Sequence, residues 1–485
     1  MNWLIIYEII YVAALLLVCL RIIYDTRTTT KTLAYLLLVV FLPLIGIFIY
    51  FSFGINYRKK KIYSKKIIAD DQLAKKLREH IFQSSRDTFE EGKEILATNR
   101  ELAYMLAKNT MSALAPNNAI KLLINGESKF PEVLNALKNA RKHIHLEYYI
   151  YEDDDIGRTI ELLLIQKAKE GVEVRFIYDD FGSRSIRKKL VPRLRDAGAK
   201  AFSFYRVNFL LLANRLNYRN HRKIIVVDGC IGFVGGINIS DRYINNINDT
   251  KKLFWRDTHL CIEGPGVQYL QYLFMCDWNF CAKDTLHHDP VFFPPASTLP
   301  VKGNKIVQIA ASGPDSDTPT ILFSLLQAIN LASKEILITT PYFIPGESIL
   351  DALIISAMGG VSVKMLVPGI SDSLLVNAAA RSYYEDLLKA GVEIYLYNKG
   401  FVHAKTLAAD RKIAIVGTAN MDHRSFDLNF EVNAIVYDEE IAKQLSDVFY
   451  DDIADAERLS LDAWNNRSVW KQLLEKSARL VSPLL

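Results

Sequence analysis

Two segments of the chain, His221-Arg-Lys-Ile-Ile-Val-Val-Asp228 and His403-Ala-Lys-Thr-Leu-Ala-Ala-Asp410, share the pattern H-x-K-x-x-x-x-D. The agreement continues beyond both segments with a glycine, an asparagine and an arginine in register: Gly235, Asn238 and Arg242 after the first, and Gly417, Asn420 and Arg424 after the second. Each residue of the second copy stands as far from its counterpart as position 403 does from position 221. Six identities in register, in a chain with nine histidines, indicate an internal duplication.

The spacing within the pattern brings two kinds of functional group together. Side chains two positions apart on a strand point to the same face, so each copy offers an imidazole beside an ammonium group. The pairs are His221 with Lys223 and His403 with Lys405. Gly229 follows Asp228, which predicts a turn between strands 224–227 and 231–234. Asp228 and Asp410 are candidate catalytic residues by their place in the pattern, but their odd offset from the lysines favours a role in holding the turn.

Two histidine–lysine pairs in one site suit the chemistry of a phosphodiester. A neutral imidazole can attack phosphorus to form a phosphohistidine, and a protonated imidazole can give its proton to the leaving oxygen. The lysines and nearby polar side chains can bind the non-bridging oxygens as charge builds up. The candidate phosphate-binding residues are Asn238, Asn420 and Thr418, which replaces Gly236 of the first copy. This chemistry requires neither a metal ion nor a cofactor, and we expect none.

A catalytic histidine usually needs a partner on its second ring nitrogen. Asp257 and Glu431 each lie downstream of one copy of the pattern, and they are the candidate partners. We interpret the other histidines as structural: His80, His143, His145, His259, His287, His288 and His423.

Helical and strand-like segments alternate around both copies. The first half shows a helical spacing over 131–140, then a strand (143–151), a helix (156–169) and a strand (172–178). The second half has helices at 321–332 and 372–390, and strands at 336–340, 361–367 and 392–397. Alternation of this kind predicts an α/β fold in which helices cover both faces of a sheet.

The duplication and the composition divide the chain into five parts. We predict a first domain over 113–288 and a second over 304–485, joined by a Pro-rich linker at 289–303. Residues 58–112 form a basic and charged helical connector, and residues 1–57 form a membrane-anchoring hairpin of two hydrophobic helices.

The prediction of a membrane anchor depends on two apolar runs. Residues 3–20 are apolar except for Glu8, and residues 32–53 are long enough to cross a hydrocarbon core of about 30 Å. A cleaved signal peptide is disfavoured, because a basic n-region and a cleavage site are missing and a second run follows. Pro43 and Gly46 in the second run leave a shallow hairpin as the alternative to two crossings.

Charges beside the hairpin predict its orientation. A basic cluster follows the second run: Arg58, Lys59, Lys60, Lys61, Lys65 and Lys66. The positive-inside tendency places everything after residue 57 in the cytoplasm, and the same cluster would attract an anionic lipid surface. We therefore expect a multi-pass membrane protein with cytoplasmic catalytic domains.

Bulk composition narrows the function classes. A net charge of +5 over 485 residues is too mild to indicate nucleic-acid binding. The five cysteines show no C-x-x-C pair and no zinc-like spacing, which indicates reduced, buried thiols facing the cytosol.

With these residues the sequence resembles the phospholipase D superfamily, whose signature is H-x-K-x-x-x-x-D followed by G-G/S/T-x-N. Within the superfamily it resembles the bacterial cardiolipin synthases over essentially the whole chain. The supporting segments include Leu146-Glu-Tyr-Tyr-Ile150, Tyr178-Asp-Asp-Phe-Gly-Ser183, Asn220-His-Arg-Lys223, Trp255-Arg-Asp-Thr-His259 and Pro341-Tyr-Phe343. The resemblance implies two α/β/α sandwich domains related by pseudo-twofold duplication, with one active site at their interface.

The resemblance also implies a reaction in the bacterial cell membrane. One phosphatidylglycerol gives a phosphatidyl-enzyme and free glycerol, and the headgroup of a second phosphatidylglycerol accepts the phosphatidyl group to give cardiolipin, without a nucleotide. By analogy His221 is the nucleophile and His403 is the acid and then the base, although the residues alone leave this order open. The resemblance gives no oligomeric state.

Four alternatives stand beside this reaction. A phospholipase D would pass the intermediate to water, and a phosphatidylserine synthase would pass its phosphatidyl group to serine. A nuclease of the same superfamily is disfavoured by the apolar runs and the mild net charge. A non-catalytic scaffold would be expected to have lost one of the four histidine and lysine residues, and all four are present.

Overall fold

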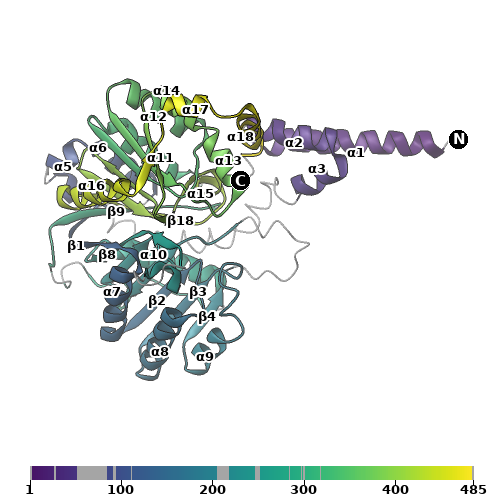
Figure 1. Ribbon diagram of the computed structural model, residues 1–485. Helices are drawn as coiled ribbons and strands as arrows, with labels where there is room; N and C mark the ends of the chain where they lie inside the picture. Colours follow the sequence, from purple (N-terminus) through teal and green to yellow (C-terminus); the bar gives the residue numbers. More distant parts are fainter. Residues whose placement is uncertain are drawn as a thin grey trace.

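The computed structural model describes residues 3–26, 29–51, 85–90, 94–110, 112–204, 218–245, 252–282, 284–295, 298, 301–316 and 318–482. The predicted basic cluster at 58–66 and His80 lie outside the described residues. Figure 1 shows two halves stacked on each other, and the N-terminal helices project from one end of them.

The first half follows the short helices α5 (Glu94–Ala97) and α6 (Arg100–Thr110). Its strands are β1 (Ala115–Ile124), β2 (His143–Tyr148), β3 (Glu173–Tyr178), β4 (Lys200–Ser203), β5 (Lys223–Val227), β6 (Ile231–Gly235), β7 (Phe254–Arg256) and β8 (Thr258–Glu263). Its helices are α7 (Asn125–Asn139), α8 (Asp155–Lys169), α9 (Leu190–Asp196), the 3-10 turn η3 (Asp241–Tyr243) and α10 (Val267–Cys281). The helices and strands predicted between residues 131 and 178 are confirmed, although α7 already begins at Asn125 and β2 ends at Tyr148.

The second half repeats the same alternation. Its strands are β9 (Lys305–Ser312), β10 (Glu335–Thr339), β11 (Phe343–Ile344), β12 (Ser362–Pro368), β13 (Glu393–Tyr397), β14 (Gly400–Val402), β15 (Thr406–Ala409), β16 (Ile413–Gly417), β17 (Met421–Asp422), β18 (Glu431–Tyr437) and β19 (Ala456–Arg458). Its helices are α11 (Thr320–Leu331), α12 (Gly346–Met358), α13 (Leu374–Arg381), α14 (Tyr384–Lys389), α15 (His423–Asp427), α16 (Glu439–Ala454), α17 (Leu461–Asn465) and α18 (Val469–Val481).

The single helix predicted over 372–390 is wrong, because two helices, α13 and α14, occupy this range. The break falls at Ser382, whose hydroxyl donates to the Ala379 carbonyl oxygen at 2.6 Å. A serine hydroxyl that bonds the preceding turn competes with the helical backbone hydrogen bonds.

In the part of the chain that the structure describes, one sheet of 15 strands runs through both halves. At its centre β1 of the first half pairs antiparallel with β9 of the second. Counted outward from this junction, the order is β8-β6-β5-β2-β3-β4 on one side and β18-β16-β15-β10-β12-β13-β19 on the other. The two orders correspond strand by strand as far as β4 and β13, which confirms the predicted duplication; β19 is an extra edge strand of the second half.

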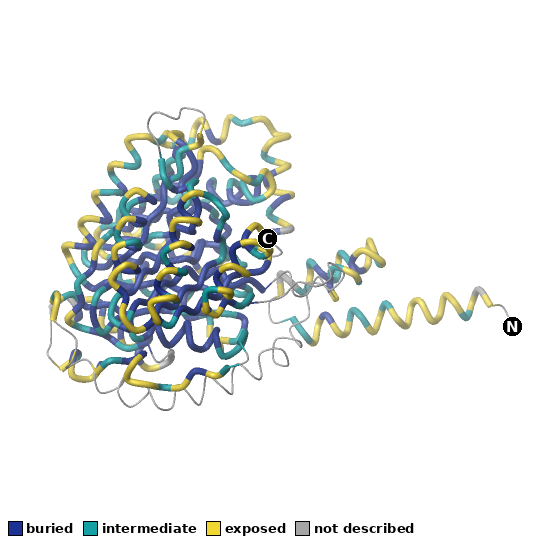
Figure 2. Tube along the Cα trace, turned by 90° about the horizontal axis from the view of Figure 1, so that it is seen from below, coloured by how far each residue is buried: buried dark blue, intermediate teal, exposed yellow. Residues whose placement is uncertain are grey.

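Helices cover both faces of this sheet. In β5, Ile224 and Val226 pack into the core under α10 and α16, whereas Ile225 and Val227 pack into the core under α7, α8 and α9. In the second half α11 and α12 enclose a separate core on their own face of the sheet. Strands that are buried on both faces have continuous apolar runs in their sequence. Figure 2 shows the buried residues in the interior and the exposed residues around them. The fold is the expected pair of α/β/α sandwiches.

The N-terminal segment forms α1 (Trp3–Asp25), α2 (Thr29–Phe41) and α3 (Pro43–Ile49). Among the described residues, only the range 5–25 is both long and apolar enough to cross a membrane. The second run, predicted to be one helix over 32–53, breaks at Leu42, because Pro43 has no N–H and disfavours helical backbone in the residue before it. α3 then packs back on α2, so closely that a Cβ at Gly46 would lie 2.4 Å from the Leu38 backbone.

Candidate active site

Each copy of the H-x-K pattern lies beside a segment of the other half. The His221 N–H donates to the Phe430 carbonyl at 2.9 Å, and this residue directly precedes Glu431. In the second copy β14 pairs with β7, and the His403 N–H donates to the Arg256 carbonyl at 2.7 Å. Because Arg256 precedes Asp257, each histidine faces the carboxylate of the other half.

Two crossed histidine–carboxylate pairs result. His221 Nδ1 lies 2.9 Å from both carboxylate oxygens of Glu431, and His403 Nδ1 lies 2.7 Å from Oδ2 of Asp257. Both carboxylates are fully buried, while the two imidazoles keep 11% and 12% of their side-chain surface exposed. A carboxylate on Nδ1 holds the proton there and leaves Nε2 with its lone pair. The predicted partners are thus in place, but they are exchanged between the halves, which the sequence did not predict.

Each lysine of the pattern contacts the backbone of its own histidine. Lys223 Nζ donates to the His221 carbonyl oxygen at 2.7 Å, and Lys405 Nζ donates to the His403 carbonyl oxygen. Burial lowers the pKa of Lys223 to about 7 and that of Lys405 to about 8. A phosphate anion bound between the two ammonium groups would favour their protonated forms.

The surroundings lower the pKa of both imidazoles. Burial lowers the pKa of His221, although Glu431 opposes this change. Burial and the nearby Lys405 lower the pKa of His403 to about 3. The charge of Lys405 also lowers the pKa of His221, and the charge of Lys223 lowers the pKa of His403. The two copies therefore form one electrostatically connected site. A neutral imidazole suits the nucleophile, whereas the acid must gain its proton when the anionic substrate binds.

The predicted phosphate-binding asparagines lie beside the two copies, with most of their polar atoms bonded within the protein. Asn238 accepts from the Ile150 N–H at 3.2 Å and donates to the Tyr243 hydroxyl at 2.7 Å. Asn420 donates to Asp422 at 3.1 Å, while its buried Oδ1 has no hydrogen-bond partner within the described residues. Their contact with phosphate stays a prediction.

Thr418 has a different role from the predicted one. Its side chain is fully buried and its hydroxyl donates to Glu431 at 2.6 Å, so its proton is not available to a phosphate. In the first copy Gly236 stands at this position, where a Cβ would lie 2.1 Å from Asp257 Oδ1. Threonine therefore positions Glu431 in one half, and glycine leaves room for Asp257 in the other.

Asp228 and Asp410 lie outside the site, which corrects their catalytic assignment and supports the turn-holding alternative. Both residues adopt a positive φ, 51° and 53°, after their strands. Asp228 accepts backbone N–H groups of residues 141–143 at 2.7 to 2.9 Å, and Asp410 accepts those of residues 333–335 at 2.8 Å. Each carboxylate ties its turn to the strand that follows a helix of the same half.

We expect Asp410→Asn to lower the melting temperature but to leave the turnover of the folded protein near that of the wild type. Backbone hydrogen bonds lower the pKa of Asp410 although burial opposes them, so the carboxylate stabilises the fold above its unfolded pKa of about 3.9. This contribution disappears as the pH falls through the lower folded pKa. At neutral pH we expect the free energy of unfolding of the variant to be about 1–2 kcal/mol smaller than that of the wild type. Thermal unfolding and initial rates measured together check this; a large rate loss at an unchanged melting temperature would contradict it.

A buried polar network behind the first copy was missed from the sequence. Asn220 donates to Glu147, and Arg222 donates to Asp277. Burial, and after it Asp277, raises the pKa of Glu147 well above its usual range. Glu147 lies in a strand-forming run and Asp277 lies among the apolar residues of α10, and a carboxylate in such surroundings is the signal that could have found them. Tyr243 was also missed; its hydroxyl lies 3.5 Å from His403 Nδ1.

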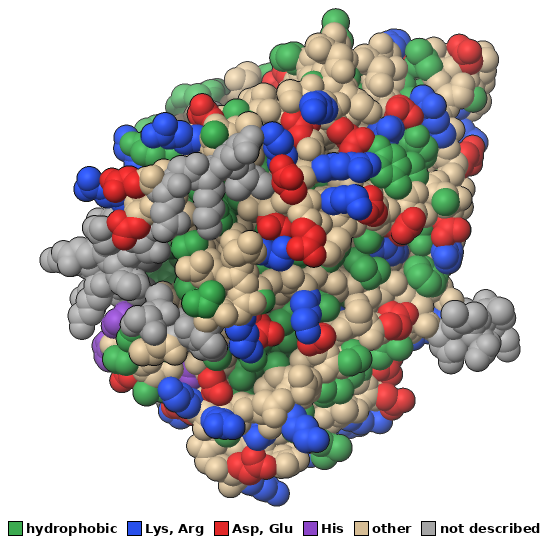
Figure 3. All heavy atoms as spheres, turned by 90° about the vertical axis from the view of Figure 1, so that its left-hand side faces the viewer, with side chains coloured by type: hydrophobic (Ala, Val, Ile, Leu, Met, Phe, Trp, Pro, Cys, Tyr) green, Lys and Arg blue, Asp and Glu red, His purple; other side chains and the backbone are tan. Residues whose placement is uncertain are grey.

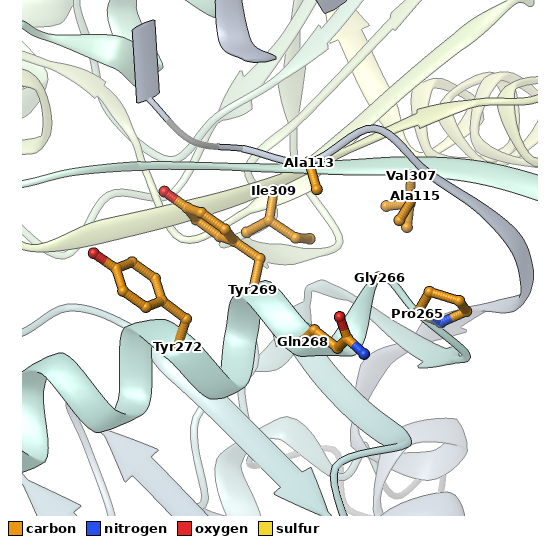
Figure 4. Close-up of a pocket in the computed structure, with 9 residues that line it drawn as sticks. All are labelled: Ala113, Ala115, Pro265, Gly266, Gln268, Tyr269, Tyr272, Val307 and Ile309. Atoms are coloured by element: carbon orange, nitrogen blue, oxygen red, sulfur yellow. The ribbon is translucent and has the colours of Figure 1, made fainter. Parts of the chain in front are cut away.

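A hollow elsewhere in the molecule carries no such groups. It lies where α10 meets β1 and β9, and Figure 4 shows Tyr269 and Tyr272 of α10 beside Ile309. Since its lining contains no histidine, lysine or carboxylate, we assign it no catalytic role. In the described ranges no group of three or more His, Cys, Asp or Glu side chains is placed to hold a metal ion, and the lack of a cofactor stays a prediction.

Known proteins are similar in sequence to this chain over nearly its whole length. A family model described as "Cardiolipin synthase, PLD-like domain" matches residues 133–261 and 325–453, and one described as "Phospholipase_D-nuclease N-terminal" matches residues 9–54. The cardiolipin synthase of Alkalihalophilus pseudofirmus is 41% identical over 480 residues, which cover 99% of this chain and 93% of that protein. The major cardiolipin synthase ClsA of Bacillus subtilis is 40% identical over 487 residues, with 99% and 98% covered.

Among solved structures, the phosphatidylserine synthase of Haemophilus influenzae aligns with a TM-score of 0.58 over 80% of this chain and 100% of that one. At 15% identity this likeness shows the fold alone. The duplicated sheet and the paired H-x-K copies thus define a phospholipase D-like enzyme. The chain belongs to the cardiolipin synthase family of these enzymes, as the resemblance predicted.

Proposed function

We propose that the protein transfers a phosphatidyl group from one phosphatidylglycerol to another, giving cardiolipin and glycerol. The observation that carries this proposal is the crossed pair of Nδ1–carboxylate contacts, His221 with Glu431 and His403 with Asp257, in a chain similar throughout to cardiolipin synthases. One phosphodiester bond breaks and one forms, so the exchange needs no nucleotide.

In the first step His221 Nε2 attacks the phosphorus of the donor lipid. The bond from phosphorus to the headgroup glycerol breaks, and His403 gives its Nε2 proton to the departing oxygen. The new N–P bond puts positive charge on the imidazole ring, which Glu431 stabilises from Nδ1 at 2.9 Å. Lys223 and Lys405 stabilise the negative charge on the non-bridging oxygens.

In the second step the acceptor is a headgroup hydroxyl of another phosphatidylglycerol. His403, now neutral, removes the proton of this hydroxyl, its oxygen attacks phosphorus, and the N–P bond to His221 breaks. Asp257 stabilises the imidazolium that forms on His403, 2.7 Å from its carboxylate. The enzyme returns to its starting protonation state.

The test follows headgroup-labelled phosphatidylglycerol with the purified full chain in mixed micelles, without nucleotide. We expect cardiolipin and free labelled glycerol in equal amounts, because each transfer releases one headgroup. Phosphatidic acid in place of cardiolipin would make the protein a phospholipase D. Phosphatidylserine formed only when serine is added would make it a phosphatidylserine synthase, and a lack of turnover would contradict the enzyme assignment.

For the membrane we propose that α1 crosses once and that α2 and α3 enter and leave on the cytoplasmic side. α2 has 13 residues and rises about 20 Å, which is shorter than a hydrocarbon core of about 30 Å. The basic run after residue 57 supports a cytoplasmic location for both catalytic halves.

Labelling with a membrane-impermeant maleimide distinguishes this topology from two crossings. We expect Asn2→Cys to react in intact cells, because one crossing puts the N-terminus outside. The control Glu439→Cys, on the exposed first turn of α16, should react only after lysis. Reaction of Asn2→Cys only after lysis would mean that the N-terminus is cytoplasmic and that the second run also crosses.

The domain boundaries complete the proposal. We keep 113–288 and 304–485 as the two catalytic domains, joined by residues 289–303. Two observations support this division: β9 begins at Lys305, and the two matches of the family model fall on either side of the linker.

A further inference from the structure

The C-terminal helix α18 has its apolar face turned away from the protein. A surface helix of a soluble domain normally buries its apolar face. Over residues 469–480 of α18 the buried side chains are Glu475 and Ala478, whereas Val469, Trp470 and Leu474 are 76%, 80% and 63% exposed. Leu473 and Leu480 are exposed as well, and at 100° per residue the five apolar side chains span an arc of about 140°. Within the described residues, no side chain buries this arc.

Ion pairs hold α18 in this orientation. Glu475 accepts two hydrogen bonds from Arg467 at 2.7 and 2.9 Å and one from Arg381 of α13 at 2.9 Å. Near the C-terminal end of α18, the hydroxyls of Ser482 and Tyr383 lie 3.0 Å apart. Rotating the helix to bury its leucines would break these contacts and leave the charge of Glu475 without partners. The outward apolar face is therefore fixed by the fold.

The exposed apolar surface continues onto the neighbouring helix. Leu374 and Leu375, in the first turn of α13, are 89% and 49% exposed, and Ile370 before them is 45% exposed. The rest of the α18 circumference carries Lys471, Lys476 and Arg479, of which Lys476 lies nearest the arc and Arg479 pairs with Asp386 of α14 at 3.3 Å. We call this surface the α13–α18 face: Ile370, Leu374, Leu375, Val469, Trp470, Leu473, Leu474 and Leu480.

The position of the α13–α18 face indicates what covers it. Figure 1 places α18 at the end of the globular part from which the apolar helix α1 projects, and Figure 2 shows that most of α1 is exposed. The opposite end, shown in Figure 3, has acidic and basic side chains interspersed over its surface. An amphipathic helix with an apolar arc, a tryptophan and lysines outside the arc is typical of helices that lie in the interface of an anionic bilayer.

We propose that the α13–α18 face inserts into the interfacial layer of the same bilayer that α1 crosses. The catalytic halves then have two attachments, the α1–α3 segment and this face, which hold them against the membrane surface. A headgroup could thus reach the active site while its acyl chains stay in the bilayer. The inference relies on the membrane location proposed above, but not on the transfer chemistry.

The depth of Trp470 tests the inference directly. The full chain, one copy per disc, is placed in lipid nanodiscs that contain phosphatidylglycerol with bromine at a shallow or a deep acyl position. Subtracting the emission of Trp470→Phe from that of the wild type isolates Trp470 from the other four tryptophans. We expect at least twofold quenching by the shallow bromines and less by the deep ones. Emission that neither lipid quenches, with only one copy present, would overturn the inference.

Activity provides a second and independent measurement. In nanodiscs we expect the double variant Leu473→Glu, Leu474→Glu to turn over phosphatidylglycerol at least fivefold more slowly than the wild type. In detergent micelles, where no flat interface has to be docked, its rate should stay within twofold of the wild type. The matched control Ile355→Glu, Met358→Glu changes two exposed apolar side chains of α12, 69% and 75% exposed, and should change neither rate.

These outcomes separate the two proposals. Equal losses in nanodiscs and in micelles would show that the α18 variant damages the fold, and would overturn the docking role. A wild-type protein that turns over no lipid in micelles would contradict the proposed function, while the bromine quenching of Trp470 would still report docking.

Discussion

Turnover of phosphatidylglycerol is expected to fall by at least about 10⁴-fold in His221→Ala and in His403→Ala, because each removes a group that must form a bond or move a proton in every cycle. The two variants should differ with an activated donor, a phosphatidyl ester of p-nitrophenol. Its leaving group departs without a proton, so His403→Ala should still release one equivalent of p-nitrophenol in a burst.

His221→Ala should give no such burst, since it lacks the proposed nucleophile. His423→Ala is the matched control, because we interpret this histidine as structural, and it should retain both the burst and the turnover. A burst in His221→Ala and none in His403→Ala would reverse the two roles. A burst in both variants would contradict a covalent histidine intermediate.

Changing the buried carboxylates is expected to have the second-largest effect. Glu431→Gln and Asp257→Asn should each lower kcat by about 10²–10⁴-fold with little change in KM, since an amide no longer holds the reactive tautomer of the histidine or stabilises its imidazolium. The crossed contacts predict which step each variant affects. Glu431→Gln should slow the p-nitrophenol burst through His221, whereas Asp257→Asn should leave the burst and slow the transfer to the acceptor.

A matched control is Glu439→Gln, which removes an exposed carboxylate on α16 and should change neither step. Melting temperatures of all three variants distinguish a lost partner from a damaged fold. A slower burst in Asp257→Asn together with a normal burst in Glu431→Gln would mean that each carboxylate acts on the histidine of its own half, and this would contradict the crossed arrangement.

Much of the fold followed from local patterns. The duplicated H-x-K segments, their turns and the alternating helices and strands all depend on residues close together in the sequence, and the structure confirms the duplicated α/β architecture. The errors in the helices have local causes too. Pro43 ends one predicted helix, and the hydroxyl of Ser382 interrupts another.

The site was harder to predict, because its contacts join distant parts of the chain. His221 and Glu431 are 210 positions apart, and His403 and Asp257 are 146 apart. Sequence position pointed to the two carboxylates that contact the histidines, but it did not predict that they are exchanged between the halves. The exchange arises from the pairing of β14 with β7 and from the hydrogen bond of His221 to Phe430. The use of the Thr418 hydroxyl by Glu431 could not be read from a sequence pattern either, since the same G-T-x-N segment would also suit a phosphate contact.

The outward apolar face of α18 shows a further limit of sequence patterns. The spacing of Val469, Trp470, Leu473 and Leu474 gives an amphipathic helix, but periodicity alone does not say which face meets the protein. The contacts of Glu475 with Arg381 and Arg467 settle this orientation.

The covalent intermediate is the most direct test of the central claim, that both halves form one site in which His221 carries the phosphatidyl group. Wild-type protein and His403→Ala would be mixed with the p-nitrophenyl donor, quenched within one turnover under alkaline conditions that preserve phosphohistidine, and digested for peptide mass spectrometry. The proposed mechanism predicts a phosphatidyl group on the peptide containing His221, accumulating in His403→Ala. A phosphatidyl group on His403, or on neither histidine, would contradict it.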